Sequence, residues 1–226
     1  MTENPLPVRV WDLPTRIFHW VLALTVVGSV ISAKIGGNAM AWHFRLGHLV
    51  LALLAFRILW GLIGGRWSRF ASFVYAPGTL MRYARGRTSP SEGLDVGHSP
   101  TSALSVFALL GFLALQVATG LVADDEIASV GPLNRFVSSA TAATATSWHT
   151  AVGQWLLITL VVLHIAAIVY YRVKKRIDLV GPMLSGDKPL PAATPASADG
   201  WQQRVLALAL AAVCVGLAGW VWKLGA

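Results

Sequence analysis

Histidine is the residue type through which this chain could bind a metal. The sequence of 226 residues holds six histidines and a single cysteine, Cys214. One cysteine excludes an internal disulfide framework and a thiolate metal cluster, and the lack of a CxxCH motif excludes covalently attached haem. Histidine is therefore the only plentiful metal ligand, and the grouping of the six residues decides what chemistry they could support.

Four of the histidines lie in apolar stretches, where an ionisable side chain is costly and marks a functional candidate. His19 and His43 begin two successive stretches, and so lie at opposite sides of the membrane. His149 and His164 lie on another stretch, fifteen residues apart, which separates them by about 22 Å along a helix. These positions predict an outer pair, His43 with His149, and an inner pair, His19 with His164.

Helical rotation supports the same grouping. At 100° per residue, His149 and His164 differ by about 60°, so both can face one bundle interior. His43 and Arg57 lie about 40° from alignment and also share a face. Arg57 then lies at the depth of the inner pair. A buried cation there needs an anion, and a haem propionate is a suitable one.

The other two histidines have weaker positions. His48 is the alternative ligand on the second stretch, but it is rotated by about 140° from His43, and a hydrogen bond to a neighbouring helix would also explain it. His98 is most simply a loop or interface residue, with a role near a cofactor or quinone as the alternative.

Small residues on the ligating helices would leave space for a flat macrocycle. Gly47 and Gly153 each follow a histidine of the outer pair by four residues, and so lie one turn away on the same face. Gly111 and Gly120 could serve the same end, or could allow close helix packing.

Two histidine pairs in opposite leaflets fit few cofactors. Structural zinc takes four ligands at one point, and a proton relay needs Asp or Glu within the apolar stretches, which contain neither. Two haems b, each with both axial positions filled by histidine, fit the count and suit electron transfer rather than O₂ binding. Facing helices in bundle cores build sites of this kind.

The composition places these helices in a membrane. Charged residues make up 12% of the chain, against about 25% in an average soluble domain. Apolar residues make up 55%, and the mean hydropathy is +0.62. Five stretches are long enough, or nearly so, to cross a hydrocarbon core of about 20 helical residues. They are 17–33, 46–65 with its helix starting near Trp42, 96–123 with Pro100 in its first turn, 136–171 and 205–222. In the fourth, the Ser-, Thr- and Ala-rich opening is expected to form a loop or a short surface helix, with the span itself starting near Ser147.

The basic residues predict the orientation, because Lys and Arg collect on the cytoplasmic side. Thirteen of the 18 precede the first stretch, or lie between the second and third or the fourth and fifth. The N-terminus is therefore expected in the cytoplasm and the C-terminus in the periplasm. The net charge of +8 reflects this topology, and nucleic-acid binding is not expected. Cleavage of the first stretch as a signal peptide is the alternative, although its apolar run is longer than a usual h-region.

The connections differ in character. Residues 67–87 mix aromatic and basic side chains, which suits a segment on the inner membrane surface or a solvated loop with a turn at Pro77. Residues 184–200 are rich in Pro, Ala and Ser and are expected to form a flexible linker. The acidic run 124–126 would face outward, either as a dock for a basic cytochrome or simply solvated.

Several motifs together resemble bacterial cytochrome b561, and most closely the branch related to the b-type cytochrome subunit of nickel-iron hydrogenases. They are Val10-Trp11-Asp12-Leu13-Pro14-Thr15-Arg16-Ile17-Phe18-His19-Trp20, the run Trp42-His43-Phe44-Arg45-Leu46-Gly47 leading to Arg57-Ile58-Leu59-Trp60-Gly61, Trp148-His149, and Leu163-His164. The resemblance covers about residues 8 to 190 and leaves out the fifth stretch.

The resemblance implies that His19, His43, His149 and His164 are axial haem ligands. It also implies a membrane electron carrier between the quinone pool and a partner at the outer face, such as a hydrogenase, a cytochrome c or a small diffusible reductant or oxidant. The spacing from His149 to His164 is about one residue longer than the family leads us to expect. A shifted register or a local bulge would account for the difference.

These observations predict an all-α integral protein of the bacterial inner membrane, in which a four-helix di-haem bundle is followed by a fifth transmembrane helix. The expected boundaries are 1–183 for the cytochrome domain, 184–200 for the linker and 201–226 for the extra helix. Arg16 or Arg57 would lie near the propionates of the inner haem. The alternatives are a haem-free anchor or transporter, and a stand-alone oxidoreductase acting on a small molecule such as superoxide. The fifth helix could bind a partner or place the C-terminus outside.

Overall fold

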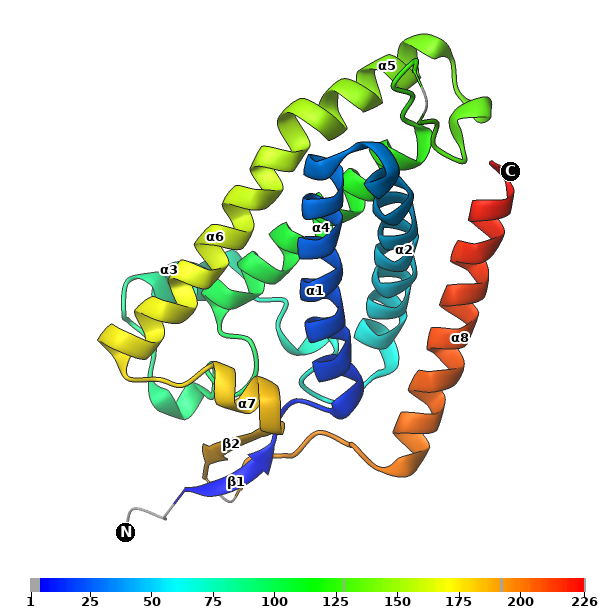
Figure 1. Cartoon of the computed structure of the whole chain (residues 1–226). Helices are drawn as coiled ribbons and strands as arrows, with labels where there is room; N and C mark the ends of the chain where they lie inside the picture. Colours follow the sequence, from blue (N-terminus) through cyan, green and yellow to red (C-terminus); the bar gives the residue numbers. More distant parts are fainter. Residues whose placement is uncertain (1–4, 128, 192, 226) are drawn as a thin grey trace. The chain divides into compact units, whose positions relative to one another are not determined.

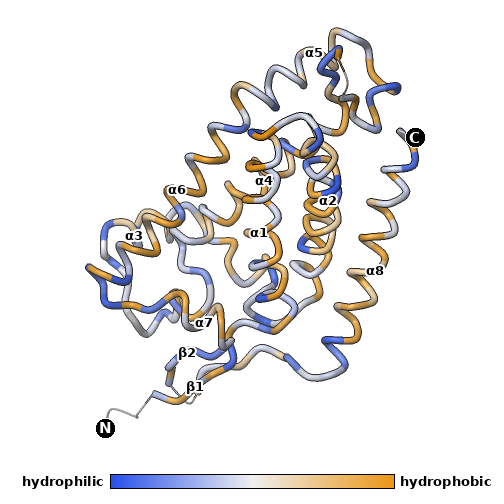
Figure 2. The backbone as a smooth tube through the Cα atoms, viewed as in Figure 1, coloured by the Kyte–Doolittle hydropathy of each residue, from blue (hydrophilic) through white to orange (hydrophobic). Residues whose placement is uncertain are grey.

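A computed structural model describes residues 5–127, 129–191 and 193–225. Its five long helices confirm the five predicted spans, and each is long and apolar enough to cross a membrane (Figure 1). They are α1 (Leu13–Ile35), α2 (Met40–Ile63), α4 (Pro100–Val122), the continuous helical segment Ser139–Lys175 that contains α6 (Gln154–Tyr170), and α8 (Trp201–Lys223). Apolar residues dominate along these helices, and hydrophilic residues gather in the connections (Figure 2).

Shorter elements connect the long helices. The short α-helices are α3 (Pro77–Ala84), α5 (Ser139–Ser147) and α7 (Val180–Ser185), and the π-helical turns are η5 (Trp148–Gly153) and η6 (Tyr171–Lys175). The 3₁₀ turns are η1 (Gly37–Ala39), η2 (Phe70–Ser72), η3 (Pro90–Glu92) and η4 (Asn134–Phe136), and the strands are β1 (Leu6–Arg9) and β2 (Asp187–Leu190).

The helix that carries His149 begins earlier than the start near Ser147 expected for the fourth span. Helix α5 begins at Ser139 and leads into η5 and α6, so a continuous helical segment covers Ser139–Lys175. The side chain of Ser138 caps the start, where its Oγ accepts a hydrogen bond from the backbone N–H of Thr141 at 3.2 Å. The Ser- and Thr-rich opening therefore starts a helix.

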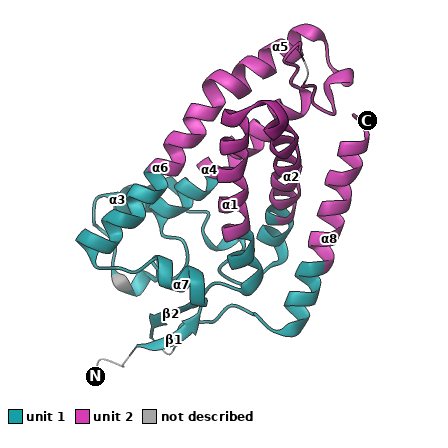
Figure 3. Ribbon diagram, in the orientation of Figure 1, with its two compact units in different colours: residues 1–18, 57–107, 163–208 teal, residues 19–56, 108–162, 209–226 magenta. Residues whose placement is uncertain are grey.

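The chain divides into two compact units, each of which is described by itself (Figure 3). Unit 1 contains residues 1–18, 57–107 and 163–208, and unit 2 contains residues 19–56, 108–162 and 209–226. The domain boundaries at residues 183 and 200 stay a prediction.

Unit 1 contains the sheet and a buried acidic residue, Asp12. Asp12 lies just before α1 and is 0% exposed. Its carboxylate accepts hydrogen bonds from the backbone N–H of Thr15 at 2.8 Å, from Nε1 of Trp60 at 3.1 Å and from Oγ of Ser68 at 2.5 Å. Asp12 therefore caps the first turn of α1 and ties it to the residues that end α2 and follow it.

Parts of the segment 184–200, which its composition predicts as a flexible linker, pair with distant parts of unit 1, while Ala192 lies outside the described residues. Strand β2 pairs antiparallel with β1, and Leu6 lies opposite Leu190. Further along, the backbone N–H of Ser197 donates to the carbonyl oxygen of Arg9 at 2.7 Å, and Nε1 of Trp67 donates to that of Pro195 at 2.8 Å. The partners in these contacts lie far away in the sequence, so the composition of the segment itself does not predict the pairing.

An ion-pair network supports the same region of unit 1. Arg9 contacts Asp187 at 2.7 Å and Asp199 at 2.6 Å, and Arg204 contacts Asp199 at 3.3 Å. Burial alone would raise the pKa of Asp199. Hydrogen bonds from Arg204, from the backbone N–H of Leu13 and from Arg9 outweigh this effect and hold the pKa below its ordinary value.

The lowered pKa of Asp199 predicts a loss of stability in acid. A carboxylate whose pKa is depressed on folding stabilises the protein above its unfolded pKa, near 3.8, and that contribution disappears as pH falls through the folded pKa. Thermal unfolding between pH 6 and pH 3 should show a smaller decline in melting temperature for Asp199→Asn than for the wild type, because Asn cannot titrate. Equal declines in the two proteins would contradict the assignment.

Unit 2 contains an apolar core made by three of its helices together with α1. The buried residues of this core are Val50, Leu54, Leu113 and Leu157, and Leu22 and Val26 of α1 pack against them. These side chains come from α1, α2, α4 and α6, so the core holds α2, which carries His43, against α6, which continues directly from the turn η5 with His149.

Candidate functional site

His149 lies within the π-helical turn η5, between α5 and α6. A π-helical turn takes up one residue more than an α-helical turn and is frequently found at functional sites. The spacing from His149 to His164 is about one residue longer than expected, and a local bulge would account for it. The π-helical turn η5 is such a bulge, and it contains His149 itself.

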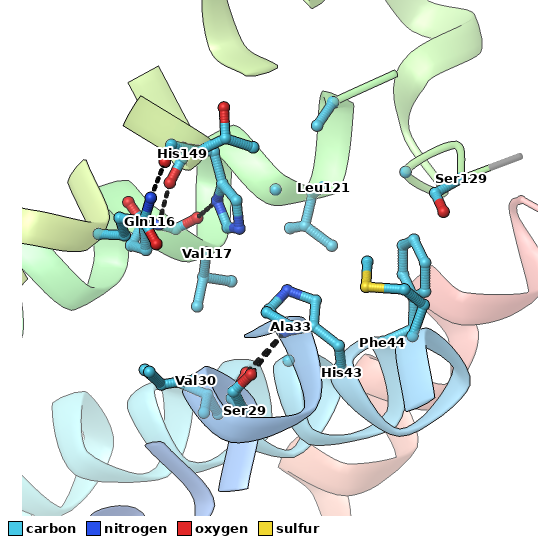
Figure 4. A pocket seen from close by; sticks show the side chains of 18 of the residues that line it. Ser29, Val30, Ala33, His43, Phe44, Gln116, Val117, Leu121, Ser129 and His149 are labelled. Atoms are coloured by element: carbon cyan, nitrogen blue, oxygen red, sulfur yellow. Dashed lines mark hydrogen bonds between the residues drawn. The ribbon is translucent and has the colours of Figure 1, made fainter. Parts of the chain in front are cut away.

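His43 and His149 face one another in unit 2. Their ring centroids are 5.9 Å apart and their planes are inclined by 82°. Figure 4 shows the two imidazoles pointing toward each other from α2 and η5. The structure thus brings together the two residues that the sequence predicts as the outer pair.

The ring nitrogens Nδ1 of both histidines are hydrogen-bonded to backbone carbonyls. Nδ1 of His43 lies 2.9 Å from the carbonyl oxygen of Ser29, and Nδ1 of His149 lies 2.8 Å from that of Gln116 (Figure 4). A carbonyl oxygen can only accept, so Nδ1 carries the proton in each ring. Each Nε2 then keeps its lone pair, which is the arrangement found in metal-ligating histidines.

A cavity of about 360 Å³ lies beside the two imidazoles, within the size range of cofactor pockets. His43 and His149 line it together with apolar side chains of α1, α2 and α4. Gly47 and Gly120 also line it, as expected for glycines that leave room beside a ligand. We call it the His43–His149 cavity.

The other two glycines have different surroundings. A Cβ atom at Gly153 would lie 2.8 Å from Nε1 of Trp148, so this glycine allows close packing. A Cβ atom at Gly111 would have no neighbour within 4 Å among the described residues.

The donor set fits a haem with two axial imidazoles. The imidazoles of His43 and His149 face each other with their centroids 5.9 Å apart and would hold the iron between them. Both rings have their second nitrogen engaged, and the cavity beside them is mainly apolar. Such surroundings exclude water and suit a flat, mostly apolar macrocycle.

Gly120 predicts a large effect of one added side chain. A Cβ atom at this position would lie 2.8 Å from Cε1 and 3.1 Å from Nδ1 of His149. Gly120→Val should displace the imidazole from the carbonyl of Gln116 and remove one haem per chain, as counted by the pyridine haemochrome method. Gly111→Ala on the same helix is the matched control and should keep the wild-type count. An unchanged count in Gly120→Val would contradict the assigned position of His149.

His48 also lines the cavity but is oriented differently. Its Nδ1 donates to the carbonyl oxygen of Phe44, one turn earlier in α2, at 2.8 Å. Its ring packs edge-on against Trp222 of α8, with centroids 4.6 Å apart. The hydrogen bond of His48 therefore stays within α2, and its contact with a neighbouring helix is a ring contact with Trp222.

Arg57 is a buried cation of unit 1. It is 3% exposed, and its guanidinium carbon lies 4.6 Å from the ring centroid of Phe70. Its Nη1 has no hydrogen-bond partner within the part of the chain that the structure describes. Arg16 donates through Nη1 to the carbonyl oxygen of Leu184.

The remaining candidate histidines fall in different units. His19 lies on the part of α1 in unit 2, where its ring contacts Trp20 edge-on at 5.0 Å. His164 lies on the part of α6 in unit 1. His98, also in unit 1, packs against Phe73 at 4.4 Å and Trp11 at 4.6 Å.

The sequence does not indicate which residues orient the two facing imidazoles. The acceptors are backbone carbonyls of Ser29 and Gln116, which every residue type possesses, so the sequence carries no direct signal for them. Gln116 did offer an indirect one, because it is a polar side chain within a charge-free span, and its Nε2 donates to the carbonyl oxygen of His149 at 2.7 Å.

Comparison with known proteins gives a family. The model of the family described as prokaryotic cytochrome b561 matches residues 10–186. Two similar proteins are each named as a probable Ni/Fe-hydrogenase B-type cytochrome subunit. The one from Bradyrhizobium diazoefficiens is 23% identical, over 80% of this chain and 85% of the relative. The one from Cupriavidus necator is 26% identical, over 78% and 85%.

A third relative has the same kind of name. It is the probable Ni/Fe-hydrogenase 1 B-type cytochrome subunit of Escherichia coli, 23% identical over 73% of this chain and 83% of its own length. No solved structure matches the chain significantly. With its five apolar helices and the match over residues 10–186, the chain belongs to the prokaryotic cytochrome b561 family, as a multi-pass membrane b-type cytochrome that transfers electrons.

Proposed function

We propose that the chain holds two haems b, each between two histidines, and relays electrons between the quinone pool and a redox partner at the outer face of the membrane. The observation that carries the proposal is the facing of His43 and His149, with each Nδ1 bonded to a carbonyl and each Nε2 left for a metal. When bound, haem b supplies an iron that exchanges single electrons.

In this proposal, His43 and His149 ligate the outer haem. The carbonyls of Ser29 and Gln116 fix the two ring orientations and increase the basicity of the ligating nitrogens. The mainly apolar lining of the His43–His149 cavity lowers the local dielectric and limits water access, which tunes the reduction potential.

The inner haem is assigned to His19 and His164 from their positions in the sequence. Arg57 supports an anionic group nearby, because its Nη1 is buried without a hydrogen-bond partner among the described residues, so a second negative charge could pair with it beside that of Asp12. A haem propionate would supply that charge. Arg16 is the second candidate for this role, and its Nε is also buried without a partner among the described residues.

The partner is proposed from the relatives. Three similar proteins are named as probable Ni/Fe-hydrogenase cytochrome subunits, so we propose a hydrogenase-like enzyme as the electron donor, with cytochrome c as the alternative partner. The basic residues of the connections support a bacterial inner-membrane location, with the N-terminus in the cytoplasm and the C-terminus in the periplasm.

Vesicles loaded with ferricyanide test the relay. With a quinol supplied from outside, vesicles that contain the protein should reduce the enclosed ferricyanide faster than protein-free vesicles, and His43→Ala should remove the difference. A haem-containing protein whose vesicles react no faster than protein-free ones would contradict the relay. A colourless protein would support the haem-free anchor or transporter instead.

A further inference from the structure

Helix α8 lies outside the residues matched by the family, yet its second half packs into unit 2. Cys214 is 1% exposed and Ala218 is 4% exposed. Residues four apart lie on one helix face, and small side chains let two helices approach closely. This part of α8 therefore has a defined face against the rest of the unit.

Trp222 continues that face by one further turn and contacts His48. The two ring centroids are 4.6 Å apart at an angle of 72°. His48 lines the His43–His149 cavity, and its Nδ1 is bonded to the carbonyl of Phe44. Its Nε2 is buried and has no hydrogen-bond partner within the described part of the chain.

The end of the chain makes a second close approach to the cavity wall. A Cβ atom at Gly225 would lie 2.5 Å from Cα of Pro132, so only glycine fits at this contact. Pro132 itself lines the His43–His149 cavity. Trp222 and Gly225 thus contact two separate parts of the cavity wall, through His48 and through Pro132.

We propose that α8 is part of the outer haem site and that Trp222 is a positioning residue that acts through His48. A buried polar atom without a partner is costly, so Nε2 of His48 is expected to gain one when the cavity fills. Because Nδ1 of His48 already donates its proton to the carbonyl of Phe44, Nε2 is an acceptor. Its partner is therefore a donor, a water held beside the haem, and Trp222 fixes the imidazole for the contact. The inference rests on the proposed di-haem function.

The test is a redox titration of the purified full-length protein. Trp222→Ala should leave two haems per chain but lower the midpoint potential of one of them, because a freed imidazole opens the wall and admits water, which favours the ferric state. The other haem should titrate as in the wild type. Trp222→Phe keeps a ring against His48 and should restore the wild-type potential. Trp220→Ala, whose side chain is 60% exposed on the same helix, is the matched control.

A double-mutant cycle tests whether Trp222 acts through His48. His48→Leu should lower the same potential, and adding Trp222→Ala should produce no further shift. If Trp222→Ala loses one haem, retention of that haem in Trp222→Phe and Trp220→Ala supports the proposal, and its loss in all three contradicts it. Wild-type potentials in Trp222→Ala, or a full additional shift in the double variant, would overturn the inference while the di-haem function stands. A haem-free wild type would instead refute the proposed function.

Discussion

His43→Ala should halve the haem content of the purified protein, from two haems b per chain to one. His43 contributes one of two imidazoles that face each other 5.9 Å apart, and alanine offers no axial ligand in its place. The remaining haem should keep the spectrum and potential of the inner site, because its proposed ligands are other histidines. Haem is counted by the pyridine haemochrome method against protein concentration.

His48→Ala is the control for this prediction. His48 lies five residues away on the same helix and lines the same cavity, but its ring faces Trp222. Its replacement should leave two haems per chain and change only the midpoint potential of the outer haem. If His48→Ala lost a haem and His43→Ala kept both, the ligand on α2 would be His48.

Asp12→Ala should cause the largest loss of stability among single changes outside the haem ligands. The substitution leaves the backbone N–H of Thr15, Nε1 of Trp60 and Oγ of Ser68 without their acceptor in a fully buried place. Each unsatisfied buried donor costs roughly 1–3 kcal/mol, so the expected loss is about 3–5 kcal/mol. Thermal unfolding in detergent, followed by tryptophan fluorescence, measures it as a lower melting temperature.

Two further variants provide reference values for the loss of stability in Asp12→Ala. Asp12→Asn keeps one acceptor oxygen and should fall between the wild type and Asp12→Ala. Arg172→Ala removes the exposed ion pair with Asp178, which spans 3.4 Å, and leaves the hydrogen bonds of Asp178 to the start of α7 in place; it should cost no more than about 1 kcal/mol. A melting temperature of Asp12→Ala equal to that of Arg172→Ala would show that the buried network contributes little.

The sequence predicts the membrane architecture well because hydropathy acts over whole helices. Five spans follow from apolar length alone, and Pro100 begins α4 as its first-turn preference indicates. The facing of His43 and His149 could also be predicted, since depth and rotation along a helix are fixed by residue number.

Features that depend on distant contacts could not be predicted. The pairing of β1 with β2 joins residues 178 positions apart at Arg9 and Asp187, and the Pro- and Ala-rich composition favours a flexible linker. The Asp12 motif supported the family resemblance, but its role as a helix cap and buried acceptor appears only once Trp60 and Ser68 are placed beside it. The packing of Trp222 on His48 has no sequence pattern of its own.

The central claim is that the chain binds two haems b between histidine pairs. The most direct test is the pyridine haemochrome and the reduced-minus-oxidised spectrum of the detergent-purified wild-type protein, with haem counted per chain after expression in haem-replete cells. The account predicts two haems b per chain. One haem would contradict the two-site arrangement, and a protein without haem would contradict the electron-transfer function itself.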